Sequence, residues 1–245
     1  MVEILMATYN GDAYIREQLD SIMCQSRDDW RLTIRDDGST DGTVDIINEF
    51  ISFYPDKVRL LDDRTSSGSA MKNFIRLIKR ATGDYVMFAD QDDVWNKDKI
   101  EKTYRLMKKM EAKYGTDKPL LIHTDMQVVD DRLGLVSPSF CNLMKLPVKK
   151  GLNDVIIQNS VVGCTVMINY RLLDMAKQLS EDAPILMHDH ALAIIAGAYG
   201  HIGFLNRPTM SYRQHAGNQV GASEGMDRLS IIRRFKQGKN AFAED

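Results

Sequence analysis

The chain has 245 residues, 44% of them hydrophobic, and a formal net charge of -2. This size and composition exclude a disordered chain and predict one large domain or two closely packed halves. Because 32 basic residues are nearly balanced by 34 acidic ones, no broad basic surface is indicated, and we expect no nucleic acid partner.

The three cysteines give no sign of a cross-linked or zinc-binding fold. Cys24, Cys141 and Cys164 are odd in number, far apart and without C-x-x-C spacing, which argues against disulfides and against a zinc knuckle. We expect three buried free thiols.

The N-terminal residues do not resemble a secretion signal. No cationic segment precedes the first apolar run, and polar residues interrupt that run after Ala7, so no signal peptide is predicted. No window approaches the roughly 20 apolar residues that a membrane-spanning helix needs. We expect a cytoplasmic protein.

The first half alternates short apolar runs with segments of helical period. This pattern predicts an α/β fold with a mostly parallel sheet and crossover helices. The predicted strands are 2–7, 30–34, 58–61 and 85–89, and the predicted helices are 13–23, 44–51, 71–78 and 97–114.

The alternation is less regular in the second half. Strands are predicted at 120–124, 161–168, 202–205 and 209–212, and a helix at 191–198. Gly115 and Pro119 interrupt the pattern between the halves. We predict a first half at 1–118, a second half at 119–222, and a basic amphipathic tail at 223–245.

Polar residues follow the first predicted strand. Thr8, Tyr9 and Asn10 precede Gly11, and small or polar groups at a strand end let a flat base approach the backbone. The alternative is a simple strand-to-helix turn ended by Asn-Gly.

An acidic loop, 36–43, follows the second strand. Its alternating acids resemble a calcium loop, but Asn48 stands at the twelfth position, where such a loop needs Glu. Asp37 can instead accept a hydrogen bond from the ring N–H of a pyrimidine base.

A second acidic loop follows the fourth strand. Asp90, Gln91, Asp92 and Asp93 are consecutive, and carboxylates at this spacing can hold a hard cation that bridges two phosphates. The alternative is a solvated cluster at a loop tip. Both acidic loops follow strands, so we expect them to face one crevice at the carboxyl edge of the sheet.

Asp189 lies between His188 and His190, just before the predicted helix 191–198. The apolar segment 185–187 precedes these three residues. A partly desolvated carboxylate suits a base that deprotonates an alcohol. A helix cap and a zinc site are the alternatives. Farther along, Arg213 can contact phosphate and His215 can complete a metal shell.

Taken in order, these segments resemble glycosyltransferase family 2, of the inverting GT-A type, and especially its bacterial rhamnosyltransferase-like members. The resemblance covers about residues 2–222 and depends on the ordered set ATYNG, DDGSTDGT, SSGSAMKNF, FADQDDVW, NSVVGCTVMIN, MHDHALA and YRQHAGN. It implies a GT-A mixed sheet flanked by helices, and a divalent metal, Mn or Mg. It also implies that 1–118 is the nucleotide-sugar (donor) binding half and 119–222 the half that binds the acceptor and carries the catalytic base.

The resemblance also implies roles for particular residues. Asp189 is the catalytic base, and this chain has His188 before it where many relatives have Glu. Asp92, helped by His215, holds the metal. The nucleotide-sugar site comprises Thr8, Tyr9, Asn10, Asp37, Ser39, Gly68, Lys72, Asn73, Asp90 and Gln91. The neighbourhood of the acceptor or diphosphate comprises Trp95, Gly163, Cys164, His188, His190 and Arg213.

The implied reaction moves a hexose or deoxyhexose to a hydroxyl of a glycan or lipid-linked oligosaccharide in surface polysaccharide or glycoprotein glycan synthesis. The implied donors are dTDP-rhamnose and UDP-glucose or UDP-galactose. Two other hypotheses remain: a haloacid-dehalogenase-like phosphatase with Asp90 as nucleophile, and a nucleotide-sugar-binding module without turnover.

The tail interleaves basic and apolar residues, such as Arg233, Arg234 and Phe235. This pattern fits a helix that contacts the inner face of a membrane or a partner, and it also fits a solvated terminal helix. A homo-oligomer is a separate hypothesis.

Overall fold

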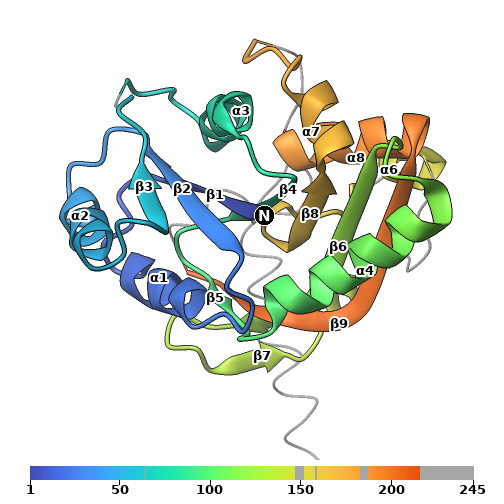
Figure 1. Cartoon of the computed structure of the whole chain (residues 1–245). Coiled ribbons are helices and arrows are strands. Elements are labelled where there is room, and N and C mark those ends of the chain that lie inside the picture. The colour runs from blue at the N-terminus through green and yellow to red at the C-terminus, as the bar shows by residue number, and fades with distance from the viewer. Residues whose placement is uncertain (64, 147–151, 158, 183–186, 216–245) are drawn as a thin grey trace, which may run out of the picture.

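A mixed β-sheet forms the centre of the computed structural model, with helices on both faces (Figure 1). The structure describes residues 1–63, 65–146, 152–157, 159–182 and 187–215. The predicted tail at 223–245 lies outside the described residues.

The sheet is parallel on one side and mixed on the other. The strands are β1 (Val2–Thr8), β2 (Trp30–Asp36), β3 (Val58–Leu60), β4 (Tyr85–Ala89), β5 (Val94–Trp95), β6 (Leu120–Val129), β7 (Leu135–Ser137), β8 (Val166–Asn169) and β9 (His201–Arg213). Their order is β3-β2-β1-β4-β8-β6-β9-β5, and β7 pairs with β6. The first four strands of this order are parallel, and β8 joins β4 in the antiparallel sense.

Two groups of helices cover the sheet. The helices are α1 (Ile15–Met23), α2 (Thr43–Phe53), α3 (Ala70–Arg80), α4 (Lys99–Tyr114), α5 (Phe140–Leu143), α6 (Leu152–Ile157), α7 (Tyr170–Ala176) and α8 (His188–Tyr199), with one 3-10 turn, η1 (Gly163–Thr165). Apolar side chains of α1, α2 and α4 belong to one core cluster, and those of α3, α7 and α8 to the other.

The period of two along β1 explains the two cores. Ile4 and Met6 face the cluster beneath α1, α2 and α4, whereas Leu5 faces the cluster beneath α3. All three side chains are buried, as expected for a strand covered on both faces. Hydrophobic burial on both faces therefore fixes the register of the central strand.

The predicted elements of the first half agree with the structure to within a few residues, apart from the short β5. In the second half, the prediction of a strand over 161–168 is wrong in its first part. There the chain forms η1, in which the Thr165 amide donates to the Val162 carbonyl, and β8 begins only at Val166. The strands predicted at 202–205 and 209–212 are one strand, β9, whose pairing with β6 shifts near Asp125.

The cysteines are free, as predicted. Cys141 and Cys164 are buried, but Cys24 is exposed, because it follows the last residue of α1 at the surface. Among the described residues, no helix combines the length and apolar character that a membrane crossing requires.

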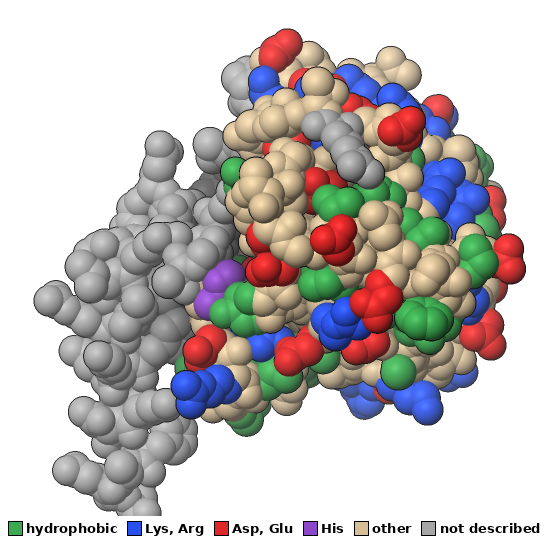
Figure 2. All heavy atoms as spheres, turned by 90° about the vertical axis from the view of Figure 1, so that its left-hand side faces the viewer, with side chains coloured by type: hydrophobic (Ala, Val, Ile, Leu, Met, Phe, Trp, Pro, Cys, Tyr) green, Lys and Arg blue, Asp and Glu red, His purple; other side chains and the backbone are tan. Residues whose placement is uncertain are grey.

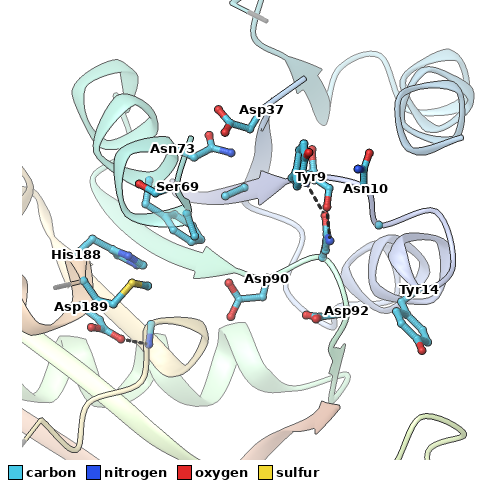
Figure 3. Close-up of a pocket in the computed structure, with 18 of the residues that line it drawn as sticks. Tyr9, Asn10, Tyr14, Asp37, Ser69, Asn73, Asp90, Asp92, His188 and Asp189 are labelled. Atoms are coloured by element: carbon cyan, nitrogen blue, oxygen red, sulfur yellow. Dashed lines mark hydrogen bonds between the residues drawn. The ribbon is translucent and has the colours of Figure 1, made fainter. Parts of the chain in front are cut away.

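The topology brings the predicted motifs to one edge of the sheet. In the parallel pairing of β1 with β2 and β4, Met6 lies opposite Ile34 and Ala89. The loops after these strands therefore leave the sheet at the same edge, as in other open α/β sheets. The N-terminus of α8 approaches this edge from the second half of the chain (Figures 1 and 3).

Candidate active site

A cavity of about 580 Å³ opens at this edge of the sheet. Figure 2 shows one face of the molecule, on which several Asp and Glu side chains lie near the middle and acidic and basic side chains are mixed toward the rim. The predicted site residues that line the cavity are Thr8, Tyr9, Asn10, Asp37, Gly68, Asn73, Asp90, Gln91, Asp92, Gly163, His188, Asp189 and His215.

Asp37 marks one end of the cavity. Its carboxylate accepts hydrogen bonds from the backbone amides of Ser67 (2.6 Å) and Gly68 (3.1 Å), and from the guanidinium of Arg35 (2.9 Å). Burial alone would raise the pKa of Asp37, but the hydrogen bonds from Ser67, Arg35 and Gly68 lower it. Asp37 is therefore an ionised acceptor at neutral pH.

Arg35, which sequence reasoning missed, holds this end together. Its side chain is fully buried and also donates to the Asn73 side chain (3.0 Å) and to the Thr65 carbonyl (2.6 Å). A buried guanidinium needs such partners. An arginine inside an apolar strand, directly before two aspartates, was the available signal.

Gln91 links the two loops that border the cavity. Its side chain accepts from the Tyr9 amide (2.8 Å) and donates to the Tyr9 carbonyl (3.0 Å). A β-carbon at Gly11 would lie 2.4 Å from the Gln91 side chain. Glycine at 11 is therefore required for this bridge, in addition to any part it has in a turn.

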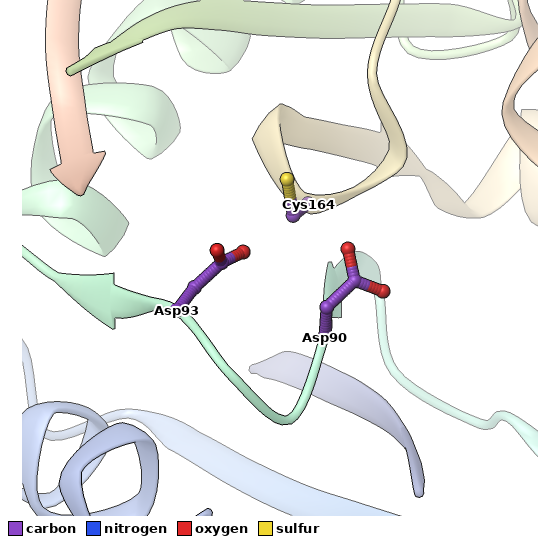
Figure 4. A group of neighbouring side chains, drawn as sticks. All are labelled: Asp90, Asp93 and Cys164. Atoms are coloured by element: carbon purple, nitrogen blue, oxygen red, sulfur yellow. The ribbon is translucent and has the colours of Figure 1, made fainter. Parts of the chain in front are cut away.

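The second acidic loop concentrates negative charge at the centre of the site. Figure 4 shows Asp90 and Asp93 directed toward Cys164, and ligand atoms of all three lie within 4.8 Å of one another. Burial, Asp92 and Asp189 raise the pKa of Asp90 to about 7, and burial with Asp92 and Asp90 raises the pKa of Asp93 well above its usual range. One oxygen of Asp93, Oδ2, is buried without a hydrogen-bond partner among the described residues.

Asp92 and His215 meet on the opposite side from Asp37. Nε2 of His215 lies 2.8 Å from Oδ2 of Asp92, and the His215 ring lies against Tyr14, with centroids 4.5 Å apart. Tyr14 lines the cavity and was missed by sequence reasoning. It directly precedes the first residue of α1, and nothing in the sequence distinguishes it from any other residue at the start of a helix.

Arg213 is placed behind the acidic loop and does not belong to the lining of the cavity. Its guanidinium donates to the backbone carbonyls of Asp92 (2.8 Å) and Asp131 (2.7 Å) and pairs with Glu17, while its amide donates to Asp93 (3.2 Å). These bonds tie the end of β9 to the acidic loop. Arg213 therefore positions that loop.

Asp189 lies in the second position of α8 and faces the cavity. It accepts hydrogen bonds from the Gly163 amide (2.9 Å) and from the side chain of Asn159 (3.2 Å), which was also missed. Burial raises the pKa of Asp189 to about 6, although these bonds oppose the shift. A carboxylate with a pKa near 6 is ionised at neutral pH and remains basic enough to take a proton.

Five other predicted residues lie outside the lining of the cavity. The Ser39 hydroxyl donates to Asp36, and the Lys72 ammonium pairs with Asp182 at the surface. The Trp95 side chain belongs to a core cluster, and the His190 ring lies 3.0 Å from the Val155 carbonyl. Cys164 lies behind Asp90 and Asp93, as described above. Each of these five residues belongs to a sequence motif of which other residues do line the cavity.

The acidic loop fits a divalent metal. Buried carboxylates whose pKa values are raised by one another, and an unpartnered carboxylate oxygen, are stabilised by a cation placed among them. Oxygen ligands with one imidazole suit Mg²⁺ or Mn²⁺. Asp92 and His215 both line the cavity, where they could hold such an ion.

Comparison with known proteins identifies the family. Residues 3–117 match the family model described as "Glycosyl transferase family 2". The dTDP-rhamnosyl transferase RfbG of Shigella flexneri is 33% identical, over 98% of this chain and 85% of that protein. The putative teichuronic acid biosynthesis glycosyltransferase TuaG of Bacillus subtilis is 29% identical, over 69% of this chain and 62% of its own length.

Solved structures show the same fold. The structure of S. aureus TarS 1-349 in complex with UDP-GlcNAc superposes with a TM-score of 0.65 at 20% identity, covering 94% of this chain and 63% of that one. The chain thus spans a little under two thirds of TarS 1-349. It belongs to glycosyl transferase family 2 and has the GT-A fold, which excludes the phosphatase hypothesis.

We predict that Mn²⁺ raises the melting temperature, more at pH 8 than at pH 6. Asp90 has a pKa of about 7, so protons compete with the metal at the lower pH. Asp92→Asn removes a ligand and is expected to reduce the shift by half or more, whereas the exposed Asp56→Asn leaves it unchanged. Equal shifts in the wild type and Asp92→Asn, measured by scanning calorimetry, would contradict this assignment.

We also predict that Asp189→Asn stabilises the fold. The raised pKa of Asp189 means that its ionisation opposes folding, a penalty absent below the unfolded pKa of 3.8 and complete above about 6. The expected gain at pH 8 is about 1 to 3 kcal/mol, and it is smaller at pH 5. Urea unfolding of both proteins at both pH values measures it, and a less stable variant at pH 8 would refute the argument.

Proposed function

We propose that the protein transfers a sugar from a nucleoside-diphosphate sugar to a hydroxyl of a glycan acceptor, with inversion at the anomeric carbon. One observation carries the proposal: a single cavity is lined both by the acidic loop at Asp92 and by the buried carboxylate of Asp189. The first suits a metal diphosphate and the second suits removal of a proton from an alcohol.

Asp189 is the general base in this proposal. It takes the proton of the acceptor hydroxyl as the hydroxyl oxygen bonds to the anomeric carbon and the diphosphate leaves from the opposite face. The bonds from Gly163 and Asn159 hold both carboxylate oxygens in place. A single displacement of this kind inverts the anomeric configuration.

The donor half of the cavity binds the nucleotide. Asp37 is fixed as an ionised acceptor suited to a base N–H, and Thr8 and Asn73 line the cavity beside it. A Mg²⁺ or Mn²⁺ ion held by Asp92 and His215 would stabilise the charge of the leaving diphosphate as a Lewis acid. Arg213 keeps the loop that carries Asp92 in position.

The donor we propose first is dTDP-rhamnose, with UDP-glucose or UDP-galactose as the alternatives. RfbG, which matches nearly all of this chain, is named a dTDP-rhamnosyl transferase. WfgD of Escherichia coli, 26% identical over 71% of this chain, is named for a UDP-Glc donor. These names support a thymidine or uridine nucleotide.

The acceptor we propose is a glycan of a surface polysaccharide, carried on a lipid at the inner face of the membrane. WfgD is named for a diphosphoundecaprenol-linked acceptor, and AmsB of Erwinia amylovora for amylovoran biosynthesis. Both are similar to this chain at 26% and 27% identity. A lipid-linked acceptor agrees with one of the two interpretations of the tail sequence, a helix that contacts a membrane.

A panel of nucleotide sugars tests the donor. We expect slow Mn²⁺-dependent hydrolysis of dTDP-rhamnose, detected as released dTDP, at a rate at least about 10-fold above UDP-glucose and UDP-galactose. Preference for a uridine sugar would replace the first donor with the alternative. Binding of nucleotide sugars without hydrolysis or transfer would instead support a module without turnover.

The pH dependence of transfer tests the base. Since Asp189 acts only when ionised, we expect kcat/KM, measured at saturating Mn²⁺, to rise with pH and to level off above about 6. Asp189→Asn is expected to lower kcat about 100-fold or more while nucleotide binding, measured by calorimetry, persists. The neighbouring His190→Gln serves as control. Wild-type turnover in Asp189→Asn would remove this residue from the mechanism.

A further inference from the structure

The ring of His188 is buried, and both of its nitrogens lack a hydrogen-bond partner within the described part of the chain. The side chain is only 1% exposed, and neither Nδ1 nor Nε2 has a hydrogen-bond partner among the described residues. Leaving a buried polar group unpaired costs about 1 to 3 kcal/mol. The same ring is among the groups that line the cavity (Figure 3).

Aromatic contacts hold this ring in one orientation. It stacks on Phe74 of α3, with centroids 4.1 Å apart and planes at 29°, and it lies 5.0 Å from the ring of Phe88 of β4. Burial lowers the pKa of His188 to about 3, so the imidazole is neutral at working pH. A neutral imidazole offers one donor and one acceptor.

The backbone of Gly163 packs against the ring. A β-carbon at Gly163 would lie 3.0 Å from Nε2 of His188 and 3.6 Å from Oδ2 of Asp189. Both polar atoms therefore lie near one point of the cavity lining, to which Gly163, His188 and Asp189 all belong. The unpaired histidine and the carboxylate are neighbours at the same part of the site.

The position of His188 in the cavity favours the donor sugar as its ligand. Phe74, on which the ring stacks, is one turn from Ala70 and Ser69 at the start of α3, and these residues line the cavity beside Gly68 and Asp37. His188 therefore lies between the nucleotide end and the base. A sugar attached to the diphosphate must occupy that interval for its anomeric carbon to come near Asp189.

We propose that His188 binds a ring hydroxyl of the donor sugar through a side-chain nitrogen and thereby selects the sugar. The assignment rests on the proposed function, because it takes the ligand to be a nucleotide sugar. A site built to hydrogen-bond a hydroxyl discriminates strongly against analogues that lack it, since the buried polar group is then left unpaired. His188 is thus a specificity-determining residue next to the base.

A cycle of protein variants and donor analogues tests the proposal. His188→Phe retains an aromatic ring against Phe74 but has no nitrogen, and monodeoxy forms of the preferred donor each lack one hydroxyl. In the wild type, removal of one particular hydroxyl is expected to weaken donor binding about 10- to 100-fold by calorimetry. In His188→Phe the same removal is expected to change binding less than about 2-fold.

Further variants separate recognition from packing. His188→Gln, whose amide also donates and accepts, is expected to restore part of the discrimination, and His190→Gln, on the same helix but outside the cavity lining, to leave it intact. Binding of the nucleoside diphosphate alone is expected to be equal in all variants. Loss of diphosphate binding and donor binding in equal proportion in His188→Phe would show a packing role and overturn the proposal.

The two proposals fail in different ways. Discrimination through His188 without hydrolysis or transfer would remove the proposed function and leave the histidine assignment intact. Transfer with equal losses for every deoxy donor in wild type and His188→Phe would leave the function intact and overturn the assignment. A wild type that binds nucleotide sugar no more tightly than nucleoside diphosphate would also overturn it.

Discussion

Mutual repulsion among carboxylates that share one buried space governs the arrangement of this molecule. Asp90, Asp92 and Asp93 come from one loop, and Asp189 approaches from the second half of the chain. Burial raises the pKa of both Asp90 and Asp189, and at Asp90 the charges of Asp92 and Asp189 raise it further. Such crowding opposes folding unless cations or hydrogen-bond donors offset it. The surrounding residues can be understood as the groups that make this concentration of charge tolerable.

Those compensating groups come from both halves of the chain. The amide and guanidinium of Arg213 contact the acidic loop, and His215 faces Asp92 from the same segment. Lys99 is buried nearby, and burial lowers its pKa to about 8, although Cys164 and Asp93 oppose that change. Stability and chemistry are therefore opposed at this site, as is common where charge is placed for a reaction.

Much of the fold was predictable, because the spacing of apolar residues along the sequence indicates which faces of each helix or strand are buried. The strands β1 and β4 are buried on both faces, so their sequences are nearly continuous apolar runs bounded by polar loops. The second half was less predictable, because η1 and β8 lie in one apolar run of the sequence. In the structure, a tertiary hydrogen bond from the Gly163 amide to Asp189 holds the start of η1. The local sequence pattern does not predict a hydrogen bond to a residue so distant in the chain.

The same distinction applies to the site. Acidic residues after strands were identifiable because charge at the carboxyl edge of a sheet is unusual unless it binds something. Arg35, Tyr14 and Asn159 were missed because each is defined by a partner distant in sequence: Asn73, His215 and Asp189. Conversely, Arg213 was identified as polar near the site, but only the structure shows that it contacts backbone behind the loop.

The bonds of Arg213 have a consequence for biosynthesis. A ribosome delivers the acidic loop more than a hundred residues before β9, so the nascent chain carries Asp90, Asp92 and Asp93 for much of translation without the strand that later holds them. Domains acquire their structure as units when the last necessary segment emerges. Until residue 213 has left the exit tunnel, the chain lacks the segment that anchors the acidic loop, and this incomplete chain is the form that chaperones and proteases would encounter.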